Sequence, residues 1–366
     1  MNPPVHPEGV TVVVIPVHNR ENYLKESVGS VLAQSTGAWR LVIVDDGSTD
    51  ATGDVADGFA RRDSRITVIH KENGGISQAR NAALRHIFRS GAGKDLGKDI
   101  GKDSASGLPG RIVFLDSDDM LHPLFIERMT GVMASTGAEV ACAATVSFHD
   151  GDRPSRRGSV PRDTEGCVEV LTPQEAQMNL FYKTAAPDAS VWGKIYSTDL
   201  LRRVAGEVSE DGCSLFAPGI IYEDLDVMYR VLRACGKVAV DSTPLHYYRH
   251  TPGSLINTFV PRRLDVLDVT DRAVGFYTRG EGADPLLARA ARNRRFAAAC
   301  NMMLLMHRNR GSFDVAERRT YAAAMERCRR IVRATRREVL ADSRARLRTR
   351  LGALLPIITL IANGKH

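Results

Sequence analysis

Short apolar runs, each followed by polar turn residues, recur along the first half of the chain. Continuous runs of this kind predict strands that are buried on both faces. Between the runs, apolar residues recur at helical spacing, as in the segment 23–34. The pattern predicts an α/β fold in which strands alternate with helices and pair mostly in parallel. The predicted strands are Thr11–Ile15, Leu41–Val44, Ile66–Ile69 and Ile112–Leu115.

Carboxylates follow two of these strands directly. Asp45 and Asp46 follow the second strand, and Asp116, Asp118 and Asp119 follow the fourth. Because the carboxyl ends of parallel strands meet at one edge of a sheet, we expect these side chains to converge there. Carboxylates that lie close together repel one another unless a cation neutralises them, and hard oxygen ligands favour Mg²⁺ or Mn²⁺. A solvated acidic turn is the alternative interpretation of the motif by itself.

A turn that contains two glycines, residues 71–77, follows the third predicted strand and precedes a helix with Arg80. We expect it at the same edge of the sheet. Glycine backbone amides, a helix N-terminus and a metal together favour a nucleotide diphosphate as the ligand. The turn fits neither GxxxxGK[ST] nor GxGxxG, which disfavours a P-loop NTPase and a dinucleotide enzyme.

The second half of the chain carries three further polar segments. The segment 190–196 is predicted to be a mixed strand or turn, and the segment 247–254 an aromatic, basic turn. Glu223 and Asp224 open a predicted helix, where the helix dipole stabilises carboxylates. The two residues fit a catalytic base and a charged first turn equally well.

A near-repeat of Gly-Lys-Asp occupies about residues 90–110, between the helix with Arg80 and the fourth strand. It contains few apolar residues, so we expect a flexible surface insertion.

Composition and charge add to this picture. A length of 366 residues favours one large α/β domain with a smaller appendage. The net charge of +7 belongs to the tail, because arginine is concentrated after about position 289. The six cysteines form no CxxC pair, which makes a zinc site improbable and indicates a reducing, cytoplasmic location. We find neither a signal peptide nor an apolar run long enough to span a membrane.

Six segments resemble, in their order along the chain, the motifs of the family 2 nucleotide-sugar glycosyltransferases of the bacterial surface-polysaccharide type. The resemblance extends from about Val10 to about Ser254. It implies the GT-A fold, a Rossmann-like α/β fold, over residues 1–256, and leaves 257–366 as an arginine-rich helical region. Two departures are the Gly-Lys-Asp insertion and His18, where the family commonly has tyrosine. The segments are 15–19, 44–50, 73–81, 114–119, 192–196 and 222–226.

The resemblance implies a role for each matching residue. Asp116 and Asp118 form the DxD pair that binds Mn²⁺ or Mg²⁺, and Asp46 accepts a hydrogen bond from the base, usually uracil. Asp224 is the implied general base, supported by Glu223. Trp192 and Lys194 lie on the acceptor side. The residues implied to bind the nucleotide sugar are Pro16, His18, Glu21, Asp46, Asn73, Arg80, Asp116, Ser117, Asp119, Arg249 and Ser254.

The expected reaction follows from these roles. Asp224 takes the proton of an acceptor hydroxyl, which attacks the anomeric carbon of a UDP-sugar, and the metal neutralises the departing UDP. Attack from the opposite face inverts that carbon, whereas retention needs a carboxylate nucleophile. The acceptor class is a glycan or a lipid-linked glycan. The alternatives are a nucleotidyltransferase on a related fold and a nucleic-acid-binding protein; the lack of interleaved aromatic residues in the basic tail disfavours nucleic acid.

The end of the chain combines an arginine-rich stretch with an apolar segment, over residues 344–362. This pattern predicts a helix that lies on the anionic inner face of the cell membrane. The equally weighted alternative is a helix packed on the protein's own core or on a second subunit, in a homo-oligomer formed through the C-terminal helices.

Overall fold

The computed structural model describes residues 9–89, 110–150, 166–251, 260–279, 283–312 and 315–354. It divides the chain into two compact units. The first holds Met1–Ala176, Ala189–Gly219 and Arg230–Gly253, and the second holds Gln177–Asp188, Ile220–Tyr229 and Ser254–His366. The last crossing between the units, at 253/254, lies close to the predicted boundary at 256/257. Two segments that we expected in the first domain, 177–188 and 220–229, belong to the second unit.

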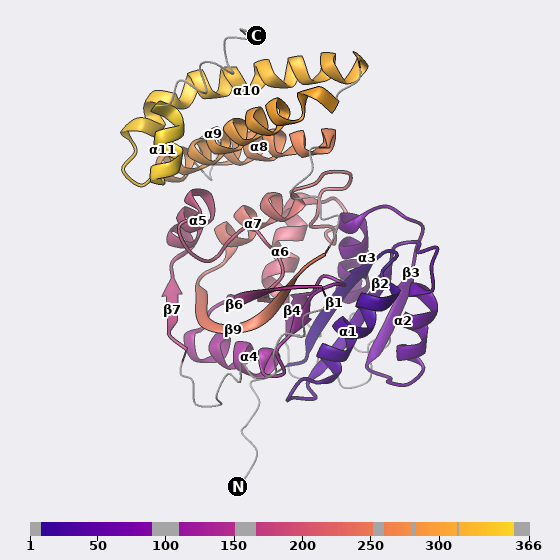
Figure 1. The fold of residues 1–366 in the computed structure, drawn as a ribbon. Helices are drawn as coiled ribbons and strands as arrows, with labels where there is room; N and C mark the ends of the chain where they lie inside the picture. Colours follow the sequence, from indigo (N-terminus) through magenta and orange to yellow (C-terminus); the bar gives the residue numbers. More distant parts are fainter. Residues whose placement is uncertain are drawn as a thin grey trace. The chain divides into compact units, whose positions relative to one another are not determined.

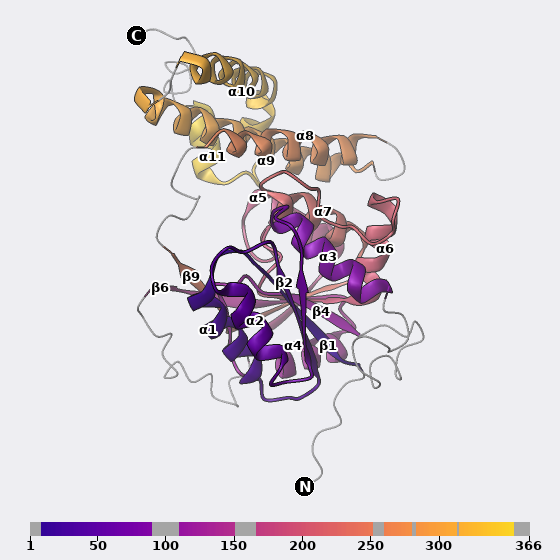
Figure 2. The same ribbon diagram turned by 90° about the vertical axis from the view of Figure 1, so that its right-hand side faces the viewer.

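The N-terminal half of the first unit is a parallel sheet in the order β3-β2-β1-β4 (Figure 1). On one face of this sheet, residues of β1 and β2 share a hydrophobic cluster with α1, α2 and α4, and α3 covers the other face (Figure 2). The alternation follows from the apolar strands, which need cover on both sides. The elements are β1 (Thr11–Val17), α1 (Glu21–Leu32), β2 (Trp39–Asp45), α2 (Thr52–Ala60), β3 (Ile66–His70), α3 (Ile76–Arg89), β4 (Arg111–Phe114) and α4 (Phe125–Thr136).

Beyond β4 the sheet becomes mixed. β8 pairs antiparallel with β4 and with β6, whereas β9 runs parallel to β6 and pairs antiparallel with β5 and β7. The α/β prediction is therefore confirmed, with parallel pairing concentrated in the first half. The elements are β5 (Met120–Leu121), β6 (Val140–His149), β7 (Val168–Leu171), α5 (Pro173–Tyr182), β8 (Lys194–Ser197), α6 (Thr198–Val208), α7 (Glu223–Ala234) and β9 (Val238–His250).

Two local predictions are wrong. β1 does not stop before Pro16 but continues to Val17, because Pro16 lacks only its own donor and both residues keep their places beside β2. The segment 247–250 is not a turn: it is the end of β9, held in the sheet by its pairing with the end of β6. Residues 252–254 of the predicted turn, including Ser254, lie outside the described residues, as do residues 90–109 of the predicted insertion.

The described C-terminal part of the second unit is helical. Asp284 caps α9 by accepting hydrogen bonds from the amides of Leu286 and Leu287. Several arginines form ion pairs with acidic side chains of neighbouring helices. In one of them, the guanidinium of Arg292 lies 2.7 Å from a carboxylate oxygen of Glu338. No helix within the described residues is long and apolar enough to cross a bilayer. The elements are η1 (Pro261–Leu264), α8 (Asp265–Thr278), α9 (Pro285–Arg308), η2 (Arg310–Ser312), α10 (Val315–Ala341) and α11 (Leu347–Leu354).

Candidate nucleotide and metal site

The end of β2 and the glycine-bearing turn meet at Asp46. One carboxylate oxygen of Asp46 accepts a hydrogen bond from the Gly74 amide at 3.0 Å, and the other accepts one from the Gly75 amide at 2.7 Å. The Lys71 ammonium pairs with the same carboxylate. Gly47 permits this approach, because it has a φ of +71° and a Cβ there would lie 2.7 Å from the Asn73 nitrogen. The predicted convergence of Asp46 with the turn is confirmed.

The loop after β1 packs against the loop after β2. The Nδ1 atom of His18 lies 3.0 Å from the carbonyl oxygen of Asp46 and 3.1 Å from the side-chain nitrogen of Asn73. Glu21 accepts a hydrogen bond from the Ala51 amide at 3.3 Å. The side chains of His18 and Asn73 are exposed, so their polar groups can reach a ligand. Pro16, inside β1, is buried.

Arg80 brings α3 to the acidic segment, residues 116–119. Its guanidinium donates to Oδ1 of Asp116 at 2.9 Å and lies over the ring of Phe216. The Arg80 side chain is 1% exposed and that of Asp116 is 26% exposed. One oxygen of Asp116 is therefore fixed by a buried cation while the carboxylate remains accessible.

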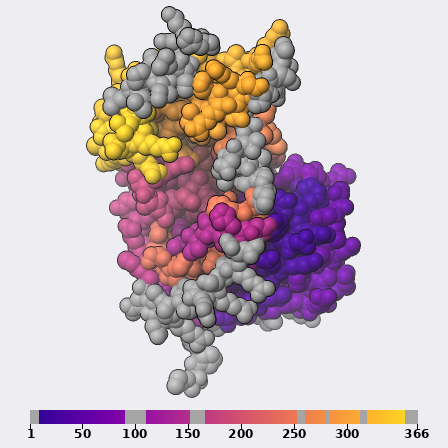
Figure 3. All heavy atoms as spheres, in the orientation of Figure 1, coloured from indigo at the N-terminus to yellow at the C-terminus, as the bar shows by residue number. Residues whose placement is uncertain are grey.

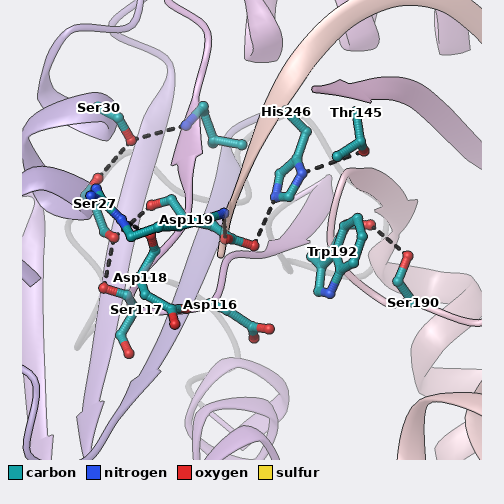
Figure 4. A network of polar contacts seen from close by, with 12 residues as sticks. Ser27, Ser30, Asp116, Ser117, Asp118, Asp119, Thr145, Ser190, Trp192 and His246 are labelled. Carbon is teal, nitrogen blue, oxygen red and sulfur yellow. Dashed lines mark hydrogen bonds and ion pairs between the residues drawn. The ribbon is translucent and has the colours of Figure 1, made fainter. Parts of the chain in front are cut away.

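Serines of α1 hold the acidic segment from the other side (Figure 4). The Ser27 hydroxyl lies 2.8 Å from the carbonyl oxygen of Ser117 and 2.6 Å from that of Asp119, and Ser30 accepts from the Leu121 amide at 3.1 Å. Neither serine was predicted from the sequence. The available signal was a pair of small polar residues one turn apart on a predicted amphipathic helix.

Asp119 is fully buried and connects the acidic segment to β9. One of its oxygens accepts a hydrogen bond from the Arg249 amide at 2.9 Å, and the other lies 3.3 Å from Nε2 of His246 (Figure 4). The buried Arg249 side chain donates to the carbonyl oxygen of Asp118 at 2.8 Å and pairs with Glu26 at 2.7 Å. Arg249 thus acts here as a support of the acidic segment, and its contact with a diphosphate stays a prediction. The same holds for a contact between Asp119 and a donor sugar.

Burial and mutual repulsion make the carboxylates of this segment harder to ionise. Burial and the charges of Asp119 and Asp116 raise the pKa of Asp118 to about 6. Burial and the charge of Asp116 raise the pKa of Asp119 to about 8, although the Arg249 cation opposes the shift. A divalent cation between Asp116 and Asp118 would relieve this repulsion.

The donor set also fits magnesium or manganese. The described residues contain no group of three or more histidine, cysteine or acidic side chains that could enclose a metal by themselves. Mg²⁺ is commonly held by one or two carboxylates, with waters and substrate phosphates as its other ligands. Two adjacent aspartates beside a predicted diphosphate site match that pattern.

Lys194 begins β8 and Trp192 lies two residues before it, both next to β4. Trp192 forms a backbone bridge with Phe114 and stacks on His246, with 4.7 Å between the ring centroids. The Lys194 side chain is buried and donates to the carbonyl oxygen of Ser190 at 2.7 Å. Lys194 therefore holds the local turn, and its contact with an acceptor stays a prediction.

Glu223 and Asp224 open α7 as predicted, within the second unit. Glu223 is buried and Asp224 half-buried. The turn before α7 is fixed by Asp265 of α8, which accepts a hydrogen bond from the Ile221 amide at 3.0 Å. Arg263 adds a contact of 3.3 Å to the Tyr222 hydroxyl. The catalytic roles of Glu223 and Asp224 stay predictions.

Residues 12–90 match the family model described as glycosyl transferase family 2. This part of the chain, about a fifth of its length, is therefore similar to glycosyl transferase family 2. The matched region holds β1, β2 and β3, the loops that carry His18 and Asp46, and helix α3 with Arg80.

Three curated relatives of this chain come from bacteria. Glycosyltransferase GlyA of Streptococcus pneumoniae serotype 4 is 26% identical over 259 residues, which are 70% of this chain and 32% of that protein. The uncharacterized glycosyltransferase EpsJ of Bacillus subtilis is 27% identical over 244 residues, 66% of this chain and 62% of that protein. The matched region is therefore about a third of the length of GlyA and under two thirds of the length of EpsJ. The putative teichuronic acid biosynthesis glycosyltransferase TuaG of Bacillus subtilis is 44% identical over 109 residues, 29% of this chain and 35% of that protein.

Solved structures confirm the fold. Residues 1–349 of S. aureus TarS, in complex with UDP-GlcNAc, align with a TM-score of 0.62 at 15% identity, over 98% of this chain and 93% of that one. The mannosyltransferase PcManGT from Pyrobaculum calidifontis, in complex with GDP-Man and Mn²⁺, aligns with a TM-score of 0.51 at 14% identity, over 97% and 86% of the two chains. These structures confirm the GT-A fold that we predicted from the sequence. The predicted family agrees with the family model that matches residues 12–90.

Proposed function

We propose that this chain transfers a sugar from a UDP-sugar to a hydroxyl group of a glycan or lipid-linked acceptor, with a divalent cation. The observation that carries the proposal is the meeting of three segments at one sheet edge. Hydrogen bonds of 2.7 and 3.0 Å join the glycine turn to Asp46, and a hydrogen bond of 2.9 Å joins Arg80, on the helix that follows this turn, to Asp116. Backbone amides and carboxylates arranged in this way suit a diphosphate and its metal.

Asp116 and Asp118 would hold Mn²⁺ or Mg²⁺. When bound, the cation would neutralise the negative charge that develops on the leaving UDP. The complexes of TarS with UDP-GlcNAc and of PcManGT with GDP-Man and Mn²⁺ support a nucleotide sugar and a metal. His18 and Asn73 offer exposed polar groups to the nucleotide, whereas both oxygens of Asp46 already accept backbone hydrogen bonds.

The proposed reaction is a single displacement with inversion. Asp224 takes the proton of the acceptor hydroxyl, the acceptor oxygen forms a bond to the anomeric carbon, and the bond from that carbon to UDP breaks. Glu223 supports the base. A retaining route needs a carboxylate nucleophile beside the sugar. Asp119, the carboxylate next to the proposed metal ligands, is buried and bonded to the Arg249 amide, which favours the single displacement.

The proposed pathway is surface polysaccharide or cell-wall glycan synthesis, with a hexosyl or N-acetylhexosaminyl group transferred. TuaG is named for teichuronic acid biosynthesis, and TarS was solved with UDP-GlcNAc. Both names support this class of substrate.

The proposed function is tested by UDP release. The full chain is incubated with Mn²⁺ and a panel of UDP-hexoses and UDP-N-acetylhexosamines, with bacterial cell-wall glycans as acceptors. We expect UDP release from at least one donor, stimulated by an acceptor and abolished in Asp224→Asn. Release of pyrophosphate from a nucleoside triphosphate, with no UDP from any donor, would show the alternative nucleotidyltransferase.

We also propose that residues 344–362 contact the inner face of the cell membrane from the cytoplasm. The described part of this segment includes α11, where Leu347 is 70% exposed and Leu351 46% exposed beside arginines. Exposed leucines next to cationic side chains suit an anionic interface. Co-sedimentation with vesicles rich in phosphatidylglycerol tests this. Absence of co-sedimentation, with a dimer in solution, would favour the homo-oligomer alternative.

A further inference from the structure

The end of the β6–β9 pair carries a face of ring and hydroxyl side chains. Alternate side chains of a strand point to the same face of the sheet. The pairing register places the alternate side chains of β6 beside those of β9. Figure 3 shows the magenta β6 and orange β9 segments together at the surface. The facing pairs are Thr145 with His246, Ser147 with Tyr248, and His149 with His250.

The rings form a continuous row that starts at Trp192. The centroids of Trp192 and Tyr248 are 5.3 Å apart and the rings are stacked, with 25° between their planes. Tyr248 meets His250 edge-on at 5.2 Å, and His250 stacks on His149 at 5.2 Å. The steps along the row are similar to one another, and each is comparable with the length of one pyranose unit.

The row leads away from the acidic segment. At its inner end, Trp192 stacks on the buried His246, which lies 3.3 Å from Asp119. The pKa of Tyr248 is raised by burial and by the charges of Asp119, Asp118 and Asp116, which places its hydroxyl within electrostatic range of that segment. At the outer end, His149 and His250 are exposed.

Exposed hydroxyl groups accompany the rings. Thr145 and Ser147 are exposed on the same face, between the inner and outer ends of the row. A saccharide has an apolar C–H face and a rim of hydroxyl groups, so it can lie on aromatic rings while it exchanges hydrogen bonds with neighbouring side chains. A row of this kind matches a chain of linked sugars better than a single small molecule.

We propose that the ring row, formed by Trp192, Tyr248, His250 and His149, binds the saccharide chain of the acceptor. The inner end takes the unit nearest the reaction, and the outer rings take units that were added earlier. The inference rests on the proposed glycosyltransferase function and extends it. It makes the preferred acceptor an oligosaccharide and not a single sugar.

The test uses the double variant His149→Ala/His250→Ala, in which only exposed side chains change, and His307→Ala as the matched control. His307 is an exposed histidine of α9. Full-length protein with UDP and Mn²⁺ is applied to a printed array of defined oligosaccharides. Each bound sequence is then titrated by calorimetry in versions of one, two and three units.

We expect three units to bind about tenfold more tightly than one unit in the wild type and in His307→Ala. The double variant should lose most of this difference while its affinity for UDP stays unchanged. Equal length dependence in the double variant, or UDP-sugar turnover without binding of any array oligosaccharide, would overturn the ring row as an acceptor site. Absence of UDP binding in the wild type would instead refute the proposed function itself.

Discussion

The guanidinium of Arg80 lies 2.9 Å from Oδ1 of Asp116, so a cation of α3 is paired with the first carboxylate after β4. Arg80 is almost completely buried, whereas Asp116 is partly exposed. The pair fixes the direction of the Asp116 side chain before any ligand arrives. Part of the geometry of the proposed metal site is therefore built into the packing of α3 against the sheet.

Replacing Arg80 should disturb both stability and ligand binding. In Arg80→Met the half-buried Asp116 loses its partner, and we expect the free energy of unfolding to fall by about 2 kcal/mol. This is less than the roughly 3–5 kcal/mol typical of fully buried pairs, because water can reach Asp116. Urea denaturation gives the stability change, and UDP titration with Mn²⁺ should show weaker binding. Arg85→Met is the control, since Arg85 of the same helix donates to the Ser214 hydroxyl and has no contact with the acidic segment among the described residues. Equal UDP affinity in both variants would contradict this role of Arg80.

The stability of the metal-free protein should decrease as pH rises. The pKa of Asp118 is about 6 in the folded protein, above its ordinary value near 4, so the folded state holds a proton that the unfolded state releases. This contribution is fully present below about pH 4 and is lost as pH rises through 6; Asp119 extends the loss toward about pH 8. Melting temperatures measured without metal between pH 4 and pH 8 should therefore fall.

Manganese should reverse this loss, because the proposed site would bind it through the deprotonated carboxylates. The rise in melting temperature on adding Mn²⁺ should be larger at pH 8 than at pH 5 in the wild type. In Asp118→Asn the rise should be small at both values. A metal-induced rise that is independent of pH would argue against Asp118 as a ligand.

Asp265 should act as a positioning residue for α7. Its carboxylate accepts a hydrogen bond from the Ile221 amide, which lies just before Glu223 and Asp224. Asp265→Ala removes this hydrogen bond and so releases the turn at which the helix starts. We expect kcat to fall about tenfold with little change in the KM for the donor, since a displaced base lowers the rate of chemistry. Asp268→Ala is the matched control, because Asp268 of the same helix pairs with Arg327 instead. Wild-type kcat in Asp265→Ala would show that the base does not depend on this hydrogen bond.

Ser27→Ala tests the support of the acidic segment from α1. The hydroxyl lies between the carbonyl oxygens of Ser117 and Asp119, and its loss leaves buried acceptors without that donor. We expect a loss of about 1–2 kcal/mol in the free energy of unfolding, together with weaker Mn²⁺ binding. Ser35→Ala, which removes an exposed hydroxyl contact to Glu127, should leave Mn²⁺ affinity unchanged. If both variants bind Mn²⁺ like the wild type, Ser27 has only a structural role.

The N-terminal part of the fold could be predicted because its signals are local. Apolar runs identified β1 to β4, and the geometry of parallel strands then placed Asp46 and Asp116 at one edge. The glycine-bearing turn joined them there because its amides bind Asp46. These inferences needed only the period of the hydrophobic pattern and the direction of the strands.

The remainder depends on contacts between distant segments. Arg249 was expected in a turn, but its pairing with Phe148 keeps it in β9, where its amide meets Asp119. Nothing in the residues near His246 indicates that it lies beside an aspartate more than a hundred positions earlier. The second unit gathers residues 177–188 with the C-terminal helices through contacts such as Tyr182 to Asp342. Patterns within one element cannot report such pairings.

The most direct test of the proposed function is calorimetric titration of UDP into the wild type and Asp118→Asn, each with and without Mn²⁺. Binding of UDP to the wild type should be at least about tenfold tighter with Mn²⁺, since Asp116 and Asp118 would hold a cation that neutralises the diphosphate charge. Asp118→Asn should bind UDP weakly under both conditions. UDP affinity that is the same in all four titrations would contradict the proposed metal-dependent diphosphate site.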